Sequence, residues 1–303
     1  MTPSQPVIKG VGDEFHLNNA RTVAEQLLSE DNLAATLYLD LLKKCLTRMA
    51  FPDLYAPLKP QKTLPRRMAL TLWQKLLSPL KLEIVRRTEF DPHLREEGLD
   101  WPGDAETMVG LERLDNLQVC ITDVLRQGVP GDLIETGVWR GGASIFMRAV
   151  LRVYGDTLRT VWLADSFQGL PKPNPESYPA DARDKSWKNA ALAIPVAEVK
   201  ANFCKYGLLD EQVRFLVGWF RDTLPTAPID KLAVLRLDGD MYESTFDALT
   251  HLYPKLSHGG YAIIDDYAIP GCQAAVEDYR VKHQIKEALV PIDQYAKFWQ
   301  RLT

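Results

Sequence analysis

Short apolar runs alternate with amphipathic stretches from about Thr107 to the end of the chain. An apolar run bounded by turn residues is typical of a buried strand, whereas apolar residues that recur every three or four positions are typical of a helix. The pattern predicts seven strands, at Leu133–Thr136, Thr160–Ala164, Val213–Val217, Leu232–Leu237, Gly260–Ile264, Ala288–Ile292 and Lys297–Leu302. It predicts helices at Glu112–Gln127, Ala143–Val153, Val196–Tyr206, Ser244–Tyr253 and Gln273–His283.

Alternation of strands and helices indicates right-handed βαβ units and a parallel sheet. The last two predicted strands are separated by too few residues for a helix, so they must pair with opposite directions. We therefore expect an α/β, Rossmann-like fold whose mostly parallel seven-stranded sheet ends in an antiparallel hairpin.

The first hundred residues have a different pattern. Residues 18–50 have helical periodicity, with Leu39, Leu42 and Leu46 on one face. Prolines are then dense between Pro52 and Pro102, which excludes a long sheet there and predicts short helices joined by extended turns. This stretch is also locally basic, which indicates either a solvated face or a rim that steers an anionic ligand. We divide the chain into an N-terminal helical region, 1–106, and an α/β domain, 107–303.

Composition narrows the function classes. The 303 residues carry 36 Lys plus Arg and 40 Asp plus Glu, a formal net charge of −4, which argues against nucleic acid as a partner. The four cysteines are scattered and the five histidines lack metal-ligand spacing, which argues against a disulfide framework or a zinc site. No apolar run reaches the roughly 18–20 residues of a membrane span, and the start lacks a secretory signal. We expect a cytoplasmic protein without a membrane partner.

The candidate chemistry follows the predicted strands, because ligands bind at the carboxyl ends of strands in open α/β sheets. The first strand leads into a glycine-rich loop, Gly137–Gly142, and then a helix whose free N–H groups favour an anion. The spacing is not GxGxxG, and Trp139 stands where a dinucleotide fold needs its second glycine. The loop therefore suits a small anionic group, such as an amino-acid carboxylate, better than a diphosphate.

Asp165 follows the second strand and Gly218-Trp219 follows the third. A carboxylate at the position of Asp165 is placed to accept the hydroxyls of a ribose, although a turn-capping aspartate is equally compatible with the sequence. Gly218 and Trp219 are compatible with an adenine site or with a plain core tryptophan.

Four carboxylates follow the fourth and fifth strands, namely Asp238, Asp240, Asp265 and Asp266. Carboxylates gathered in a dry cleft repel one another, and a hard divalent cation such as Mg²⁺ resolves this because it prefers oxygen ligands. Each aspartate taken singly is also compatible with a capping role. For the set we predict a metal site.

Five strings in order over residues 100–303 carry a family resemblance: Thr107–Gly110 with Arg113–Leu117, Glu135–Ala143, Asp165–Pro171, Leu237–Tyr242 and Asp265–Tyr267. With these strings the chain resembles the macrocin O-methyltransferase (TylF-type) family of S-adenosylmethionine-dependent enzymes. The resemblance implies a class I methyltransferase domain. It also implies Mg²⁺-dependent transfer of a methyl group from S-adenosylmethionine to a hydroxyl of a natural-product sugar in antibiotic biosynthesis.

The resemblance also implies roles for individual residues. Asp238, Asp265 and Asp266 would hold the metal, Asp240 would be the general base, and Tyr242 and Tyr267 would contact the acceptor. Residues 1–106 would form a lid and a contact in a homodimer or higher homo-oligomer. The residues on the cofactor would be Thr107, Met108, Glu135, Gly137, Trp139, Gly141, Ala143, Ser144, Asp165, Ser166, Gly218, Trp219 and Asp238.

Other functions remain open on the sequence alone. The same chemistry suits a hydroxyl of a carrier-bound polyketide or peptide, or a catechol-like diol. An NAD-dependent oxidoreductase shares the fold and the ribose carboxylate, but the glycine spacing and the lack of a hydride-chemistry acid disfavour it. A cofactor-binding protein without catalysis is disfavoured because it has no use for four clustered acids.

Overall fold

A computed structural model describes residues 33–58 and 64–302 of the chain. The chain forms two compact units, Met1–Leu41 and Leu42–Thr303. Of the helix predicted over residues 18–50, residues 33–46 are helical, residues 47–50 form a turn, and residues 18–32 lie outside the described part of the chain. Leu42 and Leu46 are buried within the second unit, as the periodicity predicts.

A seven-stranded sheet forms the centre of the second unit, with the order β5-β4-β3-β6-β7-β9-β8. The first five strands in this order are parallel, and β9 runs antiparallel to both of its neighbours. This confirms the expected mostly parallel sheet with a terminal antiparallel hairpin. The strands are β3 (Asp132–Thr136), β4 (Val161–Asp165), β5 (Val213–Val217), β6 (Leu232–Leu237), β7 (Leu256–Ile264), β8 (Val290–Pro291) and β9 (Lys297–Gln300).

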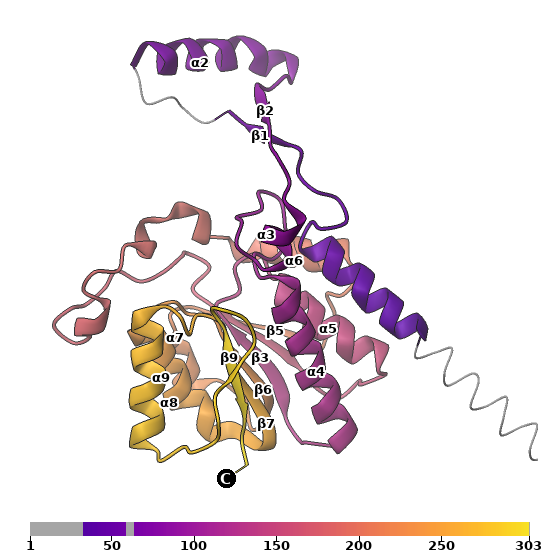
Figure 1. Cartoon of the computed structure of the whole chain (residues 1–303), viewed down its shortest axis with the longest axis vertical. Helices are drawn as coiled ribbons and strands as arrows, with labels where there is room; N and C mark the ends of the chain where they lie inside the picture. Colours follow the sequence, from indigo (N-terminus) through magenta and orange to yellow (C-terminus); the bar gives the residue numbers. More distant parts are fainter. Residues whose placement is uncertain (1–32, 59–63, 303) are drawn as a thin grey trace, which may run out of the picture. The chain divides into compact units, whose positions relative to one another are not determined.

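Helices cover both faces of the sheet (Figure 1). On one face, apolar residues of β3, β4, β6 and β7 share a core with α8 (Tyr242–Leu252) and α9 (Pro270–Lys282), and α7 (Phe220–Thr223) lies beside α8. On the other face, α4 (Leu111–Gln127) packs on β6 and β7, and α5 (Gly142–Val153) packs on β3 and β4. Helix α6 (Val196–Lys205) precedes β5. Apolar side chains point alternately to the two faces of each strand, so both faces are buried and the strands read as nearly continuous apolar runs.

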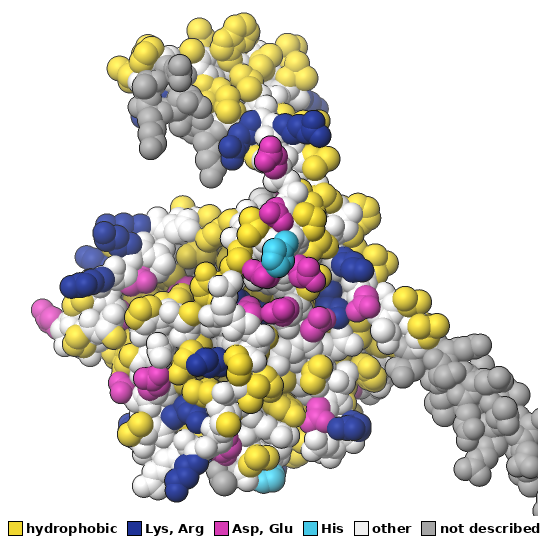
Figure 2. Space-filling view, viewed as in Figure 1, with side chains coloured by type: hydrophobic (Ala, Val, Ile, Leu, Met, Phe, Trp, Pro, Cys, Tyr) yellow, Lys and Arg dark blue, Asp and Glu magenta, His cyan; other side chains and the backbone are white. Residues whose placement is uncertain are grey.

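In the part that the structure describes, the proline-dense segment contains helices and no long sheet, as predicted, but it also contains a short two-stranded ladder that was not predicted. Strands β1 (Tyr55–Pro57) and β2 (Val85–Arg87) make a two-stranded antiparallel ladder, and α3 (Pro92–Glu96) follows it. Helix α2 (Leu64–Leu77) has Pro65 as its second residue, where the missing N–H removes no hydrogen bond. Figure 2 shows hydrophobic side chains gathered over α2, and Leu64, Met68 and Leu72 are among its exposed residues.

The observed helix ends differ from the predicted ones by a few residues, and the hairpin strands are shorter than predicted. Helix α9 begins at Pro270 rather than Gln273 because proline is favoured in the first turn. Strand β8 covers only Val290–Pro291 of the predicted 288–292. Over residues 33–58 and 64–302, every helix is too short or too polar to span a bilayer.

Candidate active site

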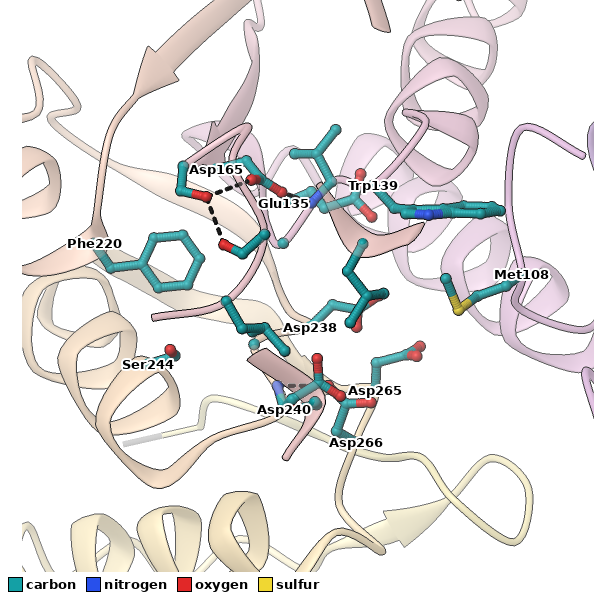
Figure 3. A pocket seen from close by; sticks show the side chains of 18 of the residues that line it. Met108, Glu135, Trp139, Asp165, Phe220, Asp238, Asp240, Ser244, Asp265 and Asp266 are labelled. Atoms are coloured by element: carbon teal, nitrogen blue, oxygen red, sulfur yellow. Dashed lines mark hydrogen bonds between the residues drawn. The ribbon is translucent and has the colours of Figure 1, made fainter. Parts of the chain in front are cut away.

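A cavity of about 310 Å³ lies at the carboxyl ends of the central strands. This volume is within the range of small-molecule sites. Its walls carry residues that follow β3, β4, β6 and β7, together with residues 107–109 from the segment before α4. In the close-up, Glu135 and Asp165 lie at one end of the site and the four aspartates at the other, with Trp139 and Met108 to one side and Phe220 to the other (Figure 3). The cavity thus lies where the topology of the sheet predicts a ligand.

Gly137 brings the loop after β3 into contact with the loop after β6. Its φ is +86°, and a Cβ added there would lie 1.6 Å from the carbonyl oxygen of Asp238. The order of strands reverses at β3: the chain adds β4 and β5 on one side of β3 and then adds β6 and β7 on the other side. The strands β3 and β6 are therefore adjacent, and their two loops meet at this switch point. Only glycine allows this close approach.

Gly137→Ala is expected to destabilise the protein by about 2–4 kcal/mol, because the methyl group adds a backbone collision to the strain of a positive φ. Gly155→Ala is the matched control, since Gly155 also has a positive φ (+69°) but has nothing within 4 Å of an added Cβ. It should cost only about 1 kcal/mol, the strain alone. Urea unfolding of both variants measures the difference, and equal losses would show that the contact with Asp238 is unimportant.

The segment 105–109 packs against the start of α5 and closes one side of the cavity. The carbonyl of Glu106 accepts a hydrogen bond from the N–H of Gly142 at 2.9 Å. The buried guanidinium of Arg95, on α3, donates to the carbonyls of Met108 (2.5 Å) and Val109 (3.0 Å). Thr107 and Met108 both line the cavity, and their contact with a cofactor stays a prediction.

Trp139 lines the cavity in a left-handed conformation, with a φ of +47°. Its indole N–H donates to the carbonyl of Ala191 at 2.9 Å, and its ring meets Trp101 edge-on. The loop that contains Ala191 is anchored at a second point, because the buried carboxylate of Asp181 accepts the N–H groups of Tyr242 (2.7 Å) and Glu243 at the start of α8. These two contacts hold the segment between β4 and α6 next to the site, and Ser166, Gly169–Pro171, Ser186, Asn189 and Leu192 of this segment line the cavity.

Glu135, at the end of β3, is buried and lines the cavity. One carboxylate oxygen accepts a hydrogen bond from the hydroxyl of Ser144, and the other accepts one from Nη1 of Arg236 at 2.6 Å. Burial raises the pKa of Glu135 to about 7, although Arg236 and Ser144 oppose this shift. Ser144 thus reaches the site through Glu135 and does not line the cavity itself.

Asp165 also lines the cavity, and its carboxylate accepts backbone N–H groups from Val138 (2.7 Å) and Phe167 (2.6 Å). This is the capping role that the sequence left open, and it holds the glycine loop against the end of β4. Burial raises the pKa of Asp165, while these hydrogen bonds lower it. Contact of Asp165 with a ribose stays a prediction.

Four aspartates meet at the carboxyl ends of β6 and β7 and line the same cavity. One carboxylate oxygen from each of Asp238, Asp265 and Asp266 lies within 4.8 Å of the others. Asp240 has a φ of +57°, and its N–H donates to Oδ2 of Asp266 at 2.9 Å. A donor set of three close carboxylates fits a hard divalent cation.

The pKa values of the four aspartates are shifted in different directions. Burial and the neighbouring Asp265 raise the pKa of Asp238, and burial with the nearby acids raises the pKa of Asp266 well above its ordinary value. Burial raises the pKa of Asp240 to about 7, with Asp238 as the next cause. Asp265 is the exception: burial raises its pKa, but two arginines outweigh burial and the net shift is downward.

Those arginines, Arg236 and Arg113, belong to the candidate site, and sequence reasoning did not identify them. Arg236 is 2% exposed, near the carboxyl end of the otherwise apolar strand β6, and donates to Glu135, Asp238 and Asp265. An arginine in an otherwise apolar buried strand requires charged partners, and this feature of the sequence could have identified Arg236. Six residues of the irregular segment 169–192 also line the cavity, and this segment has no periodic pattern that could have indicated them: Gly169, Leu170, Pro171, Ser186, Asn189 and Leu192.

Five of the predicted site residues do not line the cavity, namely Gly141, Ser144, Gly218, Tyr242 and Tyr267. Gly141 lies at the start of α5, where a Cβ would collide with Val199. The hydroxyl of Tyr242 donates a hydrogen bond to Asp278, and the hydroxyl of Tyr267 donates one to Glu277. Both acceptors lie on α9, so both tyrosine side chains are held against that helix. The remaining predicted site residues lie together around the cavity.

Comparison with known proteins identifies the family of the chain. The sequence profile of the macrocin O-methyltransferase (TylF) family matches residues 35–301. The 8-demethyl-8-(2,3-dimethoxy-alpha-L-rhamnosyl)-tetracenomycin-C 4'-O-methyltransferase of Streptomyces olivaceus is 52% identical over 274 residues, 90% of this chain and 95% of the relative. The mycinamicin III 3''-O-methyltransferase of Micromonospora griseorubida is 53% identical over 221 residues, 72% of this chain and 87% of the relative.

A solved structure supports the same assignment. The O-methyltransferase NovP matches with a TM-score of 0.76 and 47% identity, over 89% of this chain and 100% of that chain. The profile match spans most of the sequence, the solved structure shares the fold, and the sequence relatives and the solved structure are all O-methyltransferases. The chain is an O-methyltransferase and belongs to the macrocin O-methyltransferase (TylF) family.

Proposed function

We propose that this O-methyltransferase transfers the methyl group of S-adenosylmethionine to a hydroxyl of a natural-product sugar, in antibiotic biosynthesis, with Mg²⁺ at the aspartate cluster. The observation that carries the proposal is the cluster itself: three close carboxylates, with Asp240 beside them, share one cavity with Glu135 and Asp165. A methyl donor at one end of such a cavity meets an acceptor hydroxyl at the other end.

The cofactor half of the proposal rests on the first two strand ends. Glu135 and the glycine loop would face the amino-acid part of S-adenosylmethionine, since a buried carboxylate and free helix N–H groups match an ammonium and a carboxylate. Asp165 would accept the ribose hydroxyls. Trp219 lines the same cavity and offers a flat face to the adenine.

The metal half rests on Asp238, Asp265 and Asp266. A divalent cation bound there would act as a Lewis acid and stabilise the negative charge that develops on the acceptor oxygen. Mg²⁺ is compatible with this donor set because it prefers oxygen ligands and also binds to oxygens of the substrate and water.

The protein's own residues accept the proton and align the reacting atoms. Asp240 accepts the proton of the acceptor hydroxyl as the oxygen forms its bond to the methyl carbon and the carbon–sulfur bond breaks, leaving a thioether and a methyl ether. The sulfonium already activates the methyl group, so the remaining task is to align oxygen, carbon and sulfur. Orientation of this kind supplies about 7–11 kcal/mol.

The relatives support a sugar acceptor. The name of the Streptomyces olivaceus enzyme includes a rhamnosyl group, and the substrate of the Micromonospora griseorubida enzyme is mycinamicin III. Trp101, Leu170 and Leu192 supply apolar surface to the cavity wall, which could contact the part of such an acceptor that is not sugar.

Calorimetric titration with S-adenosylhomocysteine in Mg²⁺ buffer tests the cofactor half directly. We expect one product molecule to bind per chain, in the micromolar range typical of small-molecule substrates. Wild-type protein supplied with S-adenosylmethionine and Mg²⁺ would then be screened for methylation of glycosylated natural products that carry vicinal diols. Saturable binding without methylation of any such acceptor would contradict the sugar assignment, and an absence of binding would contradict the cofactor site.

The N-terminal region completes the proposal. We place the lid and the contact between identical subunits there, as the resemblance implies. Helix α2 supports this, because Leu64, Met68, Leu72 and Leu76 are each more than 60% exposed and follow one another at four-residue spacing. Light scattering of the wild-type protein measures the assembly.

A further inference from the structure

Both carboxylate oxygens of Asp265 are held by arginines from two different elements. Arg236, on β6, donates from Nη2 to Oδ1 at 2.6 Å, and Arg113, on α4, donates from Nη1 to Oδ2 at 2.6 Å. The carboxylate cannot rotate without breaking one of these charge-assisted bonds. Among the residues that the structure describes, Asp265 is the member of the acid cluster that is bonded in this way from both sides.

Arg113 is itself fixed by the segment that joins β8 to β9. Its Nε donates to Oδ2 of Asp293 at 2.6 Å, and its guanidinium lies over the ring of Tyr295 at 5.6 Å. The other oxygen of Asp293 accepts the N–H groups of Tyr295 (2.8 Å) and Ala296 (2.7 Å), which fixes the turn. The side chains of Arg113 and Asp293 are 11% and 7% exposed. Arg113 therefore connects a fixed turn to the acid cluster.

A plain structural ion pair would explain the burial of Arg113 but not its position. Arg113 lines the cavity, and its planar fork is oriented by one carboxylate while it orients another. Buried ion pairs are weak evidence for stability, because desolvation offsets the attraction, so geometry is the better account of what this pair provides.

We propose that Arg113, oriented by Asp293, is a positioning residue that fixes the carboxylate of Asp265 in the geometry a divalent cation requires. The inference rests on the metal site of the proposed function. Partners of metal ligands typically contribute 10–100-fold to metal affinity by orienting the ligand, so we expect an effect of about that size here.

The test measures binding of Mn²⁺ to wild-type protein and to Arg113→Lys and Arg113→Met, from the electron paramagnetic resonance signal of the free ion. The two variants separate geometry from charge. Arg113→Lys keeps the positive charge but loses the planar fork, and Arg113→Met loses both. Positioning predicts that each variant binds Mn²⁺ about 10-fold or more weakly. A purely electrostatic role predicts wild-type affinity for Arg113→Lys and tighter binding for Arg113→Met, because a competing positive charge is gone.

Three further measurements separate the positioning role from a general effect of mutation on the helix, the cofactor site or the fold. Arg126→Met removes an exposed arginine from the same helix and should leave Mn²⁺ affinity unchanged. Affinity for S-adenosylhomocysteine reports the integrity of the cofactor site and should stay within about twofold of wild type in every variant. Asp293→Asn, which keeps the oxygen that caps the turn, is the milder variant if Arg113→Met does not fold, and it should also weaken Mn²⁺ binding.

The outcomes separate the two proposals. If wild-type protein does not bind Mn²⁺ at all, the metal half of the proposed function is wrong and this inference fails with it. If wild-type protein binds Mn²⁺ and Arg113→Lys and Asp293→Asn bind it equally well, the metal site stands and the positioning role is wrong. Loss of Mn²⁺ affinity with unchanged product affinity supports the inference.

Discussion

Asp240→Asn is expected to lower kcat by about 10²–10⁴, the usual contribution of a positioned general base. The amide is close in shape to the carboxylate but cannot accept the proton of the acceptor hydroxyl. Because the backbone N–H that bonds to Asp266 remains, the cluster should keep its arrangement and its affinity for a divalent cation. Asp222→Asn, which removes an exposed carboxylate on α7, should leave the rate unchanged.

The pH dependence of the wild-type rate follows from the same residue. Burial and the neighbouring carboxylates raise the pKa of Asp240 to about 7 without a cation, so the base is lost as the pH falls through that value. A cation bound beside Asp240 favours the charged form and moves the loss of rate to lower pH. Initial rates measured from pH 5 to pH 9 should therefore rise with pH and then level off. The Asp240→Asn variant should lack this inflection, and an Asn variant with the wild-type rate and profile would show that Asp240 is not the base.

Arg236→Leu is expected to destabilise the fold by about 3–5 kcal/mol. Arg236 is the common partner of Glu135, Asp238 and Asp265, all of which lie in or beside the cavity. Burial disfavours its charge, but Asp265, Asp238 and Glu135 outweigh burial and raise its pKa. Leucine fills much of the volume but leaves these carboxylates without their counter-ion.

Thermal unfolding measures this loss, and a decrease in Tm of about 10 °C corresponds to it for a domain of this size. Arg214→Leu is the matched control, because Arg214 is an exposed arginine on another strand of the same sheet, the edge strand β5. Lowering the pH should reduce the difference between Arg236→Leu and wild type, since the carboxylates left unpaired become protonated. A variant as stable as wild type at pH 8 would mean that the acid cluster does not need Arg236.

Local pattern was sufficient for most of the site. The carboxyl end of each strand was predictable from apolar runs, and the residue that follows each strand could be read directly, as with Asp165 and Asp238. Tyr242 and Tyr267 show the limit of this reasoning. Both stand one or two residues from site aspartates in the sequence, yet their hydroxyls are bonded to α9 and their rings do not line the cavity. Adjacency along the chain gives the position of a backbone but not the direction of a side chain.

The sequence by itself determined the parallel sheet, the glycine loop and the gathering of carboxylates at one edge, because strand periodicity and residue order are local properties that survive into the fold. Only the tertiary structure decided how those carboxylates are neutralised and held. Arg236 meets Glu135 across 101 residues, and Arg113 meets Asp265 and Asp293 across 152 and 180 residues. Pairings at such separations depend on which strands and helices become neighbours, and no local pattern encodes that choice.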